Sequence, residues 1–227
     1  MPKIAVIGLG RFGMALARQL GASGAQVIAI DRRQTLIDEV RDEVSVAVCM
    51  DATDEIALRS QDVEHVDTCV VAIGENFEAS LLTTVIVKRM GVKEVICRAQ
   101  TQFHAEIFRQ VGADDVIQPE IQAGTHLGHC LANEHINDFI TLPDGYTLIE
   151  LRAPAKFHGK SVGQLELRTK FEVNLVAIRR ETESEQDGQT VVSVQTIGVI
   201  GPDDCIEPKD VLVLVGTDEA LARLPRE

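Results

Sequence analysis

The stretch that decides the fold is IAVIGLGRFG, residues 4–13, close to the start of the chain. An apolar run leads into Gly8, Gly10 and Gly13, spaced as GxGxxG, and a segment with helical periodicity follows. The first glycine permits a tight turn, the second lets the main chain approach a phosphate, and the third lets helix and strand pack closely. Phosphates would meet free backbone amides at the positive end of the helix. The stretch therefore predicts a nucleotide-binding unit of strand, turn and helix.

Asp31 ends a second apolar run, about twenty residues beyond the glycines, where a carboxylate accepts hydrogen bonds from ribose hydroxyls. Its charge disfavours a 2′-phosphate, although Arg32 and Arg33 follow and could tolerate one. NAD, NADH, ATP, ADP and AMP all remain candidate ligands. Arg11 adds a cationic side chain to the cradle and suits terminal phosphates. The alternative is that Arg11 simply faces solvent in the first helical turn.

Short apolar runs alternate with segments of helical periodicity from Lys3 to about Ile117. The runs predict strands at residues 3–8, 25–31, 44–49, 67–74, 94–99 and 114–118. The segments between them predict helices at residues 14–20, 34–41, 54–60, 78–90 and 103–111. Strands that are apolar on both faces and separated by helices form parallel sheets. The fold class is therefore α/β, with a Rossmann-type doubly wound parallel sheet.

After Pro119 the pattern predicts one long helix that continues to residue 138. Small and apolar residues form a broad stripe along it: Ile121, Gly124, Leu127, Gly128, Leu131, His135 and Ile136. The helix either covers the sheet or leaves the first domain and docks on a second copy of the chain.

The rest of the chain is rich in strand patterns and predicts a small α+β subdomain. Turn-forming residues lie at 143–145 and 186–188, and the polar stretch 179–190 is expected to be an exposed, mobile loop. The sequence analysis assigns 1–137 to the nucleotide-binding domain with its crossover helix, and 138–227 to the C-terminal ligand-binding and dimerisation subdomain.

The amino-acid composition and the net charge limit which classes of protein and of binding partner are possible. The 227 residues are 45% hydrophobic and 25% charged, as in a globular protein, and no apolar run is long enough to span a membrane. The net charge of −13 argues against nucleic acid as a partner. The apolar N-terminal run lacks a cleavage site, so the expected location is the cytoplasm. The five cysteines are scattered, so no disulfide framework is expected.

The sequence offers no catalytic constellation beside the nucleotide motif, and the protein is expected not to be an enzyme. It contains no GxSxG elbow, HExxH pair or GxxxxGK[ST] loop. His126 and His129, with Cys130 next along, could bind a metal, but such residues on a lone helix are more often just a helix face.

Several segments, in order and spacing, resemble the regulatory subunits of bacterial potassium-uptake systems of the Ktr and Trk type, built from RCK (KTN) domains. They are AVIGLGRFG, VIAID, the DAT of residues 51–53, VVAIGENFEASLLTTVIVK at 70–88, CRAQ at 97–100 and VGADDVIQPE at 111–120. The resemblance covers essentially the whole chain. It implies a cytosolic regulatory subunit, a dimer assembled into an octameric ring, that lies beneath a potassium-translocating membrane subunit and exchanges ATP for ADP.

The resemblance also implies roles for individual residues. Gly8, Gly10, Arg11, Phe12 and Gly13 would hold phosphates and Asp31 the ribose, with Arg32 beside it. The base would lie near Asp51, Ala52 and Thr53, and Arg98 would face the phosphates. The central segment contributes Ala72, Ile73, Gly74 and Asn76. Glu120 matches an acid that helps to hold a divalent cation, Mg²⁺ or Ca²⁺, near the terminal phosphate.

Three alternatives remain open. The nucleotide could be a permanent structural scaffold of the ring instead of a signal. The chain could be an NAD(H)-binding redox sensor or a dehydrogenase-like protein, which Asp31 favours. Some members of the family bind cyclic di-AMP between two C-terminal subdomains, and Arg168 and Asn174 resemble the residues used there. Those two residues could equally be ordinary cap and strand residues.

Overall fold

A computed structural model describes residues 1–132, 136–186 and 189–225 of the chain, and within 182–192 it describes only the backbone. The chain forms two compact units, Met1–Ala123 and Gly124–Glu227. The division falls inside a helix, whereas the sequence analysis placed the boundary after residue 137, which stays a proposal. Within the described residues, no helix has both the length and the apolar character that crossing a membrane requires.

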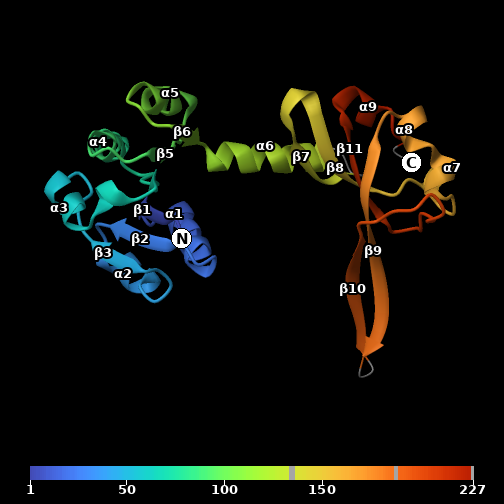
Figure 1. Ribbon diagram of the computed structural model, residues 1–227, viewed down its shortest axis with the longest axis horizontal. Helices are drawn as coiled ribbons and strands as arrows, with labels where there is room; N and C mark the ends of the chain where they lie inside the picture. The colour runs from blue at the N-terminus through green and yellow to red at the C-terminus, as the bar shows by residue number, and fades with distance from the viewer. Residues whose placement is uncertain (133–135, 187–188, 226–227) are drawn as a thin grey trace. The chain divides into compact units, whose positions relative to one another are not determined.

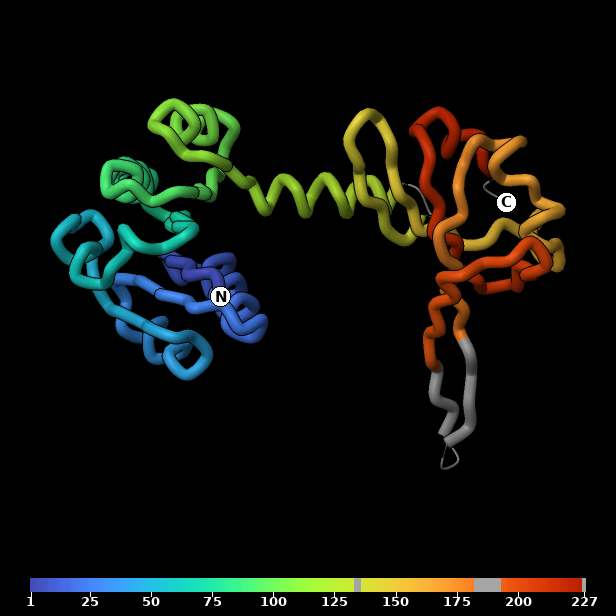
Figure 2. The backbone as a smooth tube through the Cα atoms, viewed as in Figure 1, coloured from blue at the N-terminus to red at the C-terminus, as the bar shows by residue number. Residues whose placement is uncertain are grey.

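The first unit is a six-stranded parallel sheet in the order β3-β2-β1-β4-β5-β6. Its strands are β1 Lys3–Ile7, β2 Gln26–Asp31, β3 Val46–Cys49, β4 Thr68–Val71, β5 Glu94–Arg98 and β6 Asp115–Ile117. The connecting helices are α1 Arg11–Ala22, α2 Gln34–Val40, α3 Glu55–Ser60, α4 Phe77–Arg89 and α5 Gln102–Gln110, with a short η1 at Val63–His65. Figure 2 traces this alternation from the blue N-terminus into the green. The predicted doubly wound sheet is confirmed, strand by strand.

Both faces of the sheet are buried, which explains the unbroken apolar runs. Alternate residues of one strand belong to different clusters: Val6 packs with Met14 and Ile37 under α1 and α2. Ala5 and Ile7 pack in the cluster that includes Leu58, Val87 and Phe108 from α3, α4 and α5. Figure 1 shows the two groups of helices on opposite sides of the sheet.

Helix α6, Pro119–Ala132, is shorter than the sequence analysis predicted. The predicted helix continued to residue 138, but Ile136 already begins strand β7, and His135 lies outside the described residues. Pairing of Ile136 with Leu151 of the neighbouring strand overrides the helical periodicity of this stretch. None of the residues of α6 is buried.

The second unit contains a five-stranded antiparallel sheet in the order β10-β9-β11-β8-β7. Its strands are β7 Ile136–Thr141, β8 Tyr146–Arg152, β9 Asn174–Gln186, β10 Gln189–Ile197 and β11 Val211–Thr217. The helical segments are η2 Pro143–Gly145, η3 Ala155–Phe157, α7 Val162–Leu165, α8 Leu167–Lys170 and α9 Asp218–Ala222. The turn predicted at 143–145 is η2, and the small α+β subdomain is confirmed.

One face of this second sheet is buried under the short helices. Burial alternates along β8 and β11, so that Ile149, Leu151, Leu212 and Leu214 face a core that includes Leu165. This period of two is the mark of a half-buried antiparallel sheet.

The loop predicted for residues 179–190 is wrong for the residues described. Strands β9 and β10 pair antiparallel from Ile178 with Ile197 out to Gln186 with Gln189. A long two-stranded ladder therefore replaces the expected mobile segment, since backbone pairing satisfies the peptide groups of a polar stretch as well as of an apolar one. The predicted turn at 186–188 lies partly outside the described residues.

Candidate functional site

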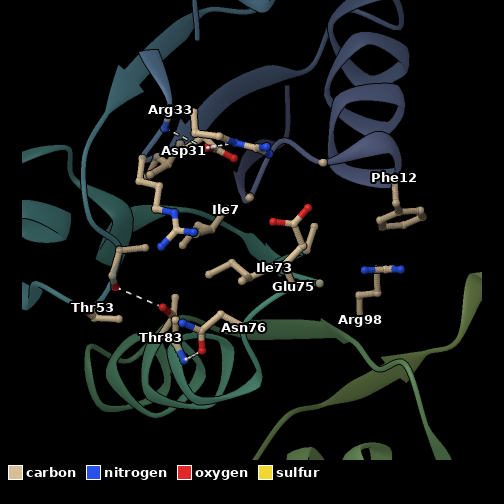
Figure 3. A pocket seen from close by; sticks show the side chains of 18 of the residues that line it. Ile7, Phe12, Asp31, Arg33, Thr53, Ile73, Glu75, Asn76, Thr83 and Arg98 are labelled. Carbon is tan, nitrogen blue, oxygen red and sulfur yellow. Dashed lines mark hydrogen bonds and ion pairs between the residues drawn. The ribbon is translucent and has the colours of Figure 1, made fainter. Parts of the chain in front are cut away.

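A pocket of about 660 Å³ lies at the carboxyl ends of the parallel strands. It is lined by residues that follow β1, β2, β3, β4 and β5, so it spans the point where the strand order reverses between β1 and β4. Ligands of open α/β sheets bind at this position, and the volume is typical of a small-molecule site. Figure 3 shows the lining side chains projecting into it.

The glycine turn joins β1 to α1 with the tight geometry that the spacing predicted. Gly8 adopts a φ of +95°, and its amide donates to the Ile30 carbonyl at 2.7 Å. A Cβ on Gly13 would lie 1.9 Å from the Gly8 carbonyl oxygen, so only glycine lets α1 approach the turn this closely. The N-cap of α1 is Gly10, which has no side chain to accept a hydrogen bond. The first amides of the helix therefore remain available to an anion.

Asp31 holds the glycine turn as well as facing the pocket. One carboxylate oxygen accepts the Leu9 amide at 2.7 Å and the other accepts the Arg33 amide at 2.8 Å. The residue is only 8% exposed. Arg33 Nε also donates to Asp31 Oδ1 at 3.4 Å. A carboxylate has about four acceptor sites, so about one remains, on Oδ2, for a ribose hydroxyl.

The loop of Asp51, Ala52 and Thr53 is fixed in place from two sides. Asp51 accepts the amide and the hydroxyl of Thr53 at 2.9 and 2.7 Å, and these hydrogen bonds lower the pKa of the Asp51 carboxyl. From α4, the buried Thr83 hydroxyl donates to the Ala52 carbonyl at 3.2 Å. The loop is thus positioned before any ligand arrives.

A second helix begins at the pocket wall. Asn76 caps α4 by accepting the Ala79 amide at 3.0 Å, and Ala72, Ile73 and Gly74 line the pocket just before it. The Gly74 carbonyl accepts the Gln100 side chain at 2.6 Å, which ties this segment to the residues after β5.

Arg98 and Glu120 form an ion pair at the edge of the pocket. Arg98 Nη2 donates to Glu120 Oε1 at 2.5 Å, and this hydrogen bond lowers the pKa of the Glu120 carboxyl. The arginine side chain is 14% exposed and the glutamate 64%. Arg98 also packs against the backbone of Gly74. A Cβ on residue 74 would lie only 1.8 Å from Arg98 Nη1. Its Nε is buried with no hydrogen-bond partner in the described part of the chain. The guanidinium is therefore held in place with donor capacity to spare.

The structure brings most of the expected site residues to this one pocket. Those that line it are Gly8, Gly10, Arg11, Phe12, Asp31, Arg32, Asp51, Ala52, Thr53, Ala72, Ile73, Gly74, Asn76, Arg98 and Glu120. Gly13 lies behind the turn and acts through packing. Arg168 in α8 and Asn174 at the start of β9 lie elsewhere, both exposed, in the second unit.

The sequence analysis missed some lining residues, among them Glu75, Glu78, Leu82 and Gln100. The acidic pair brackets the start of α4 and lies within the segment 70–88 that carried the family resemblance, but no site role was assigned to it. Thr83 was also missed, although a polar pair of threonines within an apolar helix was a usable signal.

Family models match both units of the chain. The TrkA-N domain matches residues 4–119 and the TrkA-C domain matches residues 146–226. The Ktr system potassium uptake protein C of Bacillus subtilis (strain 168) is 32% identical over 224 residues, 99% of this chain and 96% of that protein. The Ktr system potassium uptake protein A of the same organism is 31% identical over 225 residues, again 99% and 96%.

Solved structures share the fold. The GsuK channel bound to NAD aligns with a TM-score of 0.63 at 15% identity, over 97% of this chain and 38% of that one. The NAD(P)-binding domain of an exopolyphosphatase-related protein from Archaeoglobus fulgidus aligns with a TM-score of 0.52 at 27% identity, over 58% of this chain and 98% of that domain.

Proposed function

Because this chain belongs to the Ktr and Trk family of potassium uptake proteins, with a TrkA-N domain followed by a TrkA-C domain, we propose that it is a nucleotide-sensing regulatory subunit. It acts in the cytoplasm, at the inner face of the membrane, on a potassium-translocating membrane subunit. The nucleotide is a signal in this proposal and undergoes no reaction.

The arrangement of one pocket carries the proposal. Uncapped amides of α1 and the guanidinium of Arg98 suit phosphates, while Asp31 suits a ribose. Asp51, Ala52 and Thr53 form a preset wall for the base. This is the donor and acceptor order of an adenine nucleotide.

The ion pair of Arg98 with Glu120 supplies a way to distinguish ATP from ADP. A terminal phosphate competes with Glu120 for the guanidinium, and the released carboxylate is then free for Mg²⁺ or Ca²⁺ beside that phosphate. ADP lacks the γ-phosphate and competes less. A ligand shifts a conformational equilibrium only by its differential affinity for the two states, so this difference is what gating uses.

A second copy of the chain completes the proposed assembly. Ile121, Leu127 and Leu131 of α6 are 50%, 57% and 71% exposed, an apolar stripe that a partner copy would cover. Dimers formed in this way assemble into the octameric ring, and Arg11 reaches towards the neighbouring nucleotide.

The second candidate function is an NAD(H) sensor. Asp31 would bind the ribose of NAD equally well, and the related domain from Archaeoglobus fulgidus binds NAD(P). A cyclic di-AMP site at Arg168 and Asn174 would be additional to either function. Both residues are exposed, and the family resemblance implies that the ligand would bind between two copies.

Thermal unfolding of the full chain with ATP, ADP, NAD or NADH separates the candidates. A ligand present at about a hundred times its Kd adds about 2.7 kcal/mol to the free energy of unfolding. We expect ATP and ADP to raise the Tm strongly and NADH weakly. A large rise with NADH alone would favour the redox sensor, and a rise with cyclic di-AMP that Arg168→Ala abolishes would support the second site.

Glu120→Gln tests the competition at the ion pair. The variant removes the negative charge that holds Arg98, so ATP binds severalfold more tightly without divalent cation, and added Mg²⁺ no longer improves binding. Glu78→Gln is the matched control, because it removes a lining carboxylate that has no ion pair with Arg98 among the described contacts. Equal effects of the two variants would contradict a specific role for Glu120.

A further inference from the structure

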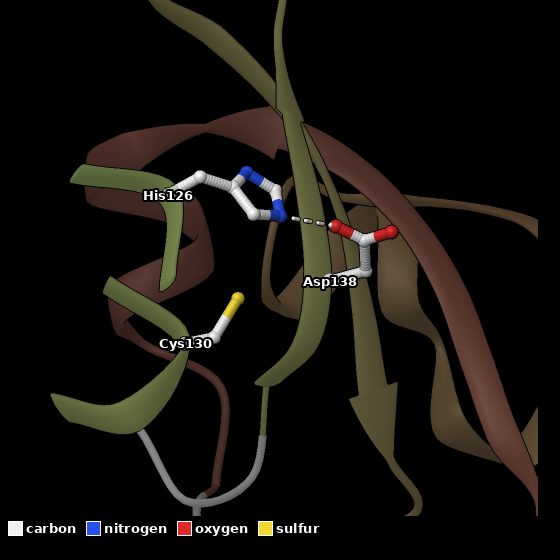
Figure 4. Close-up of side chains that lie close together, drawn as sticks. All are labelled: His126, Cys130 and Asp138. Atoms are coloured by element: carbon white, nitrogen blue, oxygen red, sulfur yellow. Dashed lines mark ion pairs between the residues drawn. The ribbon is translucent and has the colours of Figure 1, made fainter. Parts of the chain in front are cut away.

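An imidazole, a thiol and a carboxylate lie close together within the second unit, at the end of α6 and the start of β7. His126 and Cys130 come from α6 and Asp138 comes from β7, and one ligand atom from each lies within 4.8 Å of the others. Figure 4 shows all three side chains directed at the same small space.

Local structure explains why they meet. Residues four apart share one face of a helix, which places His126 above Cys130. Asp138 lies on β7, next to an irregularity in the strand pairing between Ile136 and Asp138. Asp138 Oδ1 lies 2.9 Å from His126 Nε2. The imidazole stacks on Phe139 with ring centroids 4.7 Å apart, so its orientation is fixed.

We propose that these three side chains bind a divalent transition-metal ion of the zinc class. Zinc binds His nitrogen, Cys sulfur and carboxylate oxygen at about 2.0 to 2.3 Å, which places tetrahedral ligand atoms about 3.3 to 3.7 Å apart. The present separations run from 2.9 Å up to the 4.8 Å limit of the cluster. Side-chain movements of about 1 Å therefore bring all three to bonding distance.

The donor set selects the class of ion. A thiolate and an imidazole favour zinc and its neighbours, whereas Mg²⁺ and Ca²⁺ prefer oxygen ligands. The thiolate and the carboxylate together carry the two negative charges that balance the ion. His126 and Asp138 are 46% and 55% exposed, so the ion can enter and a fourth ligand, such as water, can complete the tetrahedron. The site is thus chemically distinct from the oxygen-ligand cation site at Glu120.

Binding would join the last turns of α6 to the edge strand of the second sheet. The three ligands span residues 126–138, and the bonded ion would hold helix and strand together across the connection between them. The inference does not depend on the nucleotide site, because all its ligands belong to the second unit.

Zinc binding by the chelator-treated, reduced full chain tests the proposal. We expect one zinc ion per chain in competition with a chromophoric chelator. Cobalt should give the thiolate charge-transfer band and the visible absorption of a tetrahedral site. His126→Ala, Cys130→Ser and Asp138→Asn should each weaken zinc binding by at least about 10-fold, the smallest effect seen even for indirect partners of a metal.

A control separates this site from other thiols. Cys205→Ser removes an exposed cysteine of the same unit and should not change the affinity. Circular dichroism of each metal-free variant checks that the fold is retained, which the exposure of these side chains favours. The proposal is overturned if wild type binds no zinc, or if Cys130→Ser and Asp138→Asn bind it as tightly as wild type.

Discussion

Two glycines of the same turn are constrained in different ways. A Cβ on Gly13 would meet the Gly8 carbonyl oxygen at 1.9 Å, so the constraint there is on packing of the protein itself. A Cβ on Gly10 would have no atom within 4 Å, and Gly10 lines the pocket. The constraint at Gly10 therefore does not come from packing within the protein.

Substitution of each glycine by alanine should change a different property: the stability of the fold for Gly13→Ala and the affinity for nucleotide for Gly10→Ala. Gly13→Ala forces α1 away from the turn, and overpacking of this kind costs about 1 to 3 kcal/mol of folding free energy. Gly10→Ala should leave the Tm unchanged but reduce nucleotide affinity at least about 10-fold, because a methyl group occupies the path of a phosphate. Urea unfolding and calorimetric titration check the two effects. Unchanged nucleotide affinity in Gly10→Ala would contradict the placement of the phosphates.

Burial should make two of the cysteines less reactive than the exposed ones. Desolvation raises the pKa of the Cys69 thiol far above its usual value and raises that of Cys97 to about 11, despite a contact of 3.2 Å with the Thr84 hydroxyl. Cys49 and Cys205 are exposed. Since the thiolate is the reactive form, iodoacetamide at pH 8 should modify the exposed pair and spare the buried pair.

Mass spectrometry of digested protein measures this labelling. Denatured protein, in which all these thiols should react, is the control. Modification of native Cys97 as fast as Cys205 would show that the sheet core opens to solvent far more readily than its packing indicates.

At the scale of elements, β9 joins the second core to the long ladder with β10. Ile178 is fully buried in that core, whereas Val176 on the same strand is 45% exposed. Truncating a buried isoleucine costs about 2 to 5 kcal/mol, and an exposed substitution stays within about 0.5 kcal/mol. Ile178→Ala should therefore destabilise the second unit and Val176→Ala should not.

The single tyrosine makes this prediction measurable. The chain has no tryptophan, and Tyr146 in β8 belongs to the second unit, so intrinsic fluorescence during urea unfolding reports on that unit alone. Equal midpoints for the two variants would mean that β9 contributes little to the core.

Strands and turns that a local pattern of apolar residues or glycines marks could be predicted from the sequence. Runs such as residues 25–31 are apolar on both faces, which only a strand between two helix layers requires, and the glycine spacing fixed the turn. The strand patterns on both sides of residues 186–188 were visible in the sequence, but the part of the ladder within residues 179–190 was not, because this stretch is polar and its register depends on the partner strand. The end of α6 at Ala132 was missed for the same reason, since β8 decides where β7 begins.

The residues of the candidate site also divide into those that a local sequence pattern predicts and those that it does not. Asp31 and the glycines follow from local spacing, and Arg98 and Glu120 came only from the family resemblance. Their ion pair joins residues 22 positions apart in the sequence, a separation at which no local pattern operates. At the proposed zinc site, the helical pair of His126 and Cys130 was visible, but Asp138 was not, because it lies on β7 in a stretch whose pattern predicted helix.

At the scale of the whole molecule, a net charge of −13 keeps copies apart unless an apolar surface joins them. The stripe on α6 is the candidate surface. Leu127→Glu combined with Leu131→Glu should lower the mass in solution towards that of a single chain, because it places charge in the proposed interface. Light scattering measures the mass.

Ile56→Glu is the matched control for this pair. Ile56 is 81% exposed on α3 and is not part of the stripe, so its substitution should leave the mass unchanged. A wild-type chain that is already a monomer, or a double variant of unchanged mass, would rule out α6 as the contact between copies.

The most direct test of the account is calorimetric titration of the full chain with ATP, ADP and NADH, beside the Arg98→Gln variant. The account predicts saturable binding of ATP and ADP, a larger loss of affinity for ATP than for ADP in the variant, and recovery of the nucleotides unaltered. Failure of both adenine nucleotides to bind, together with oxidation of NADH by the protein, would contradict it.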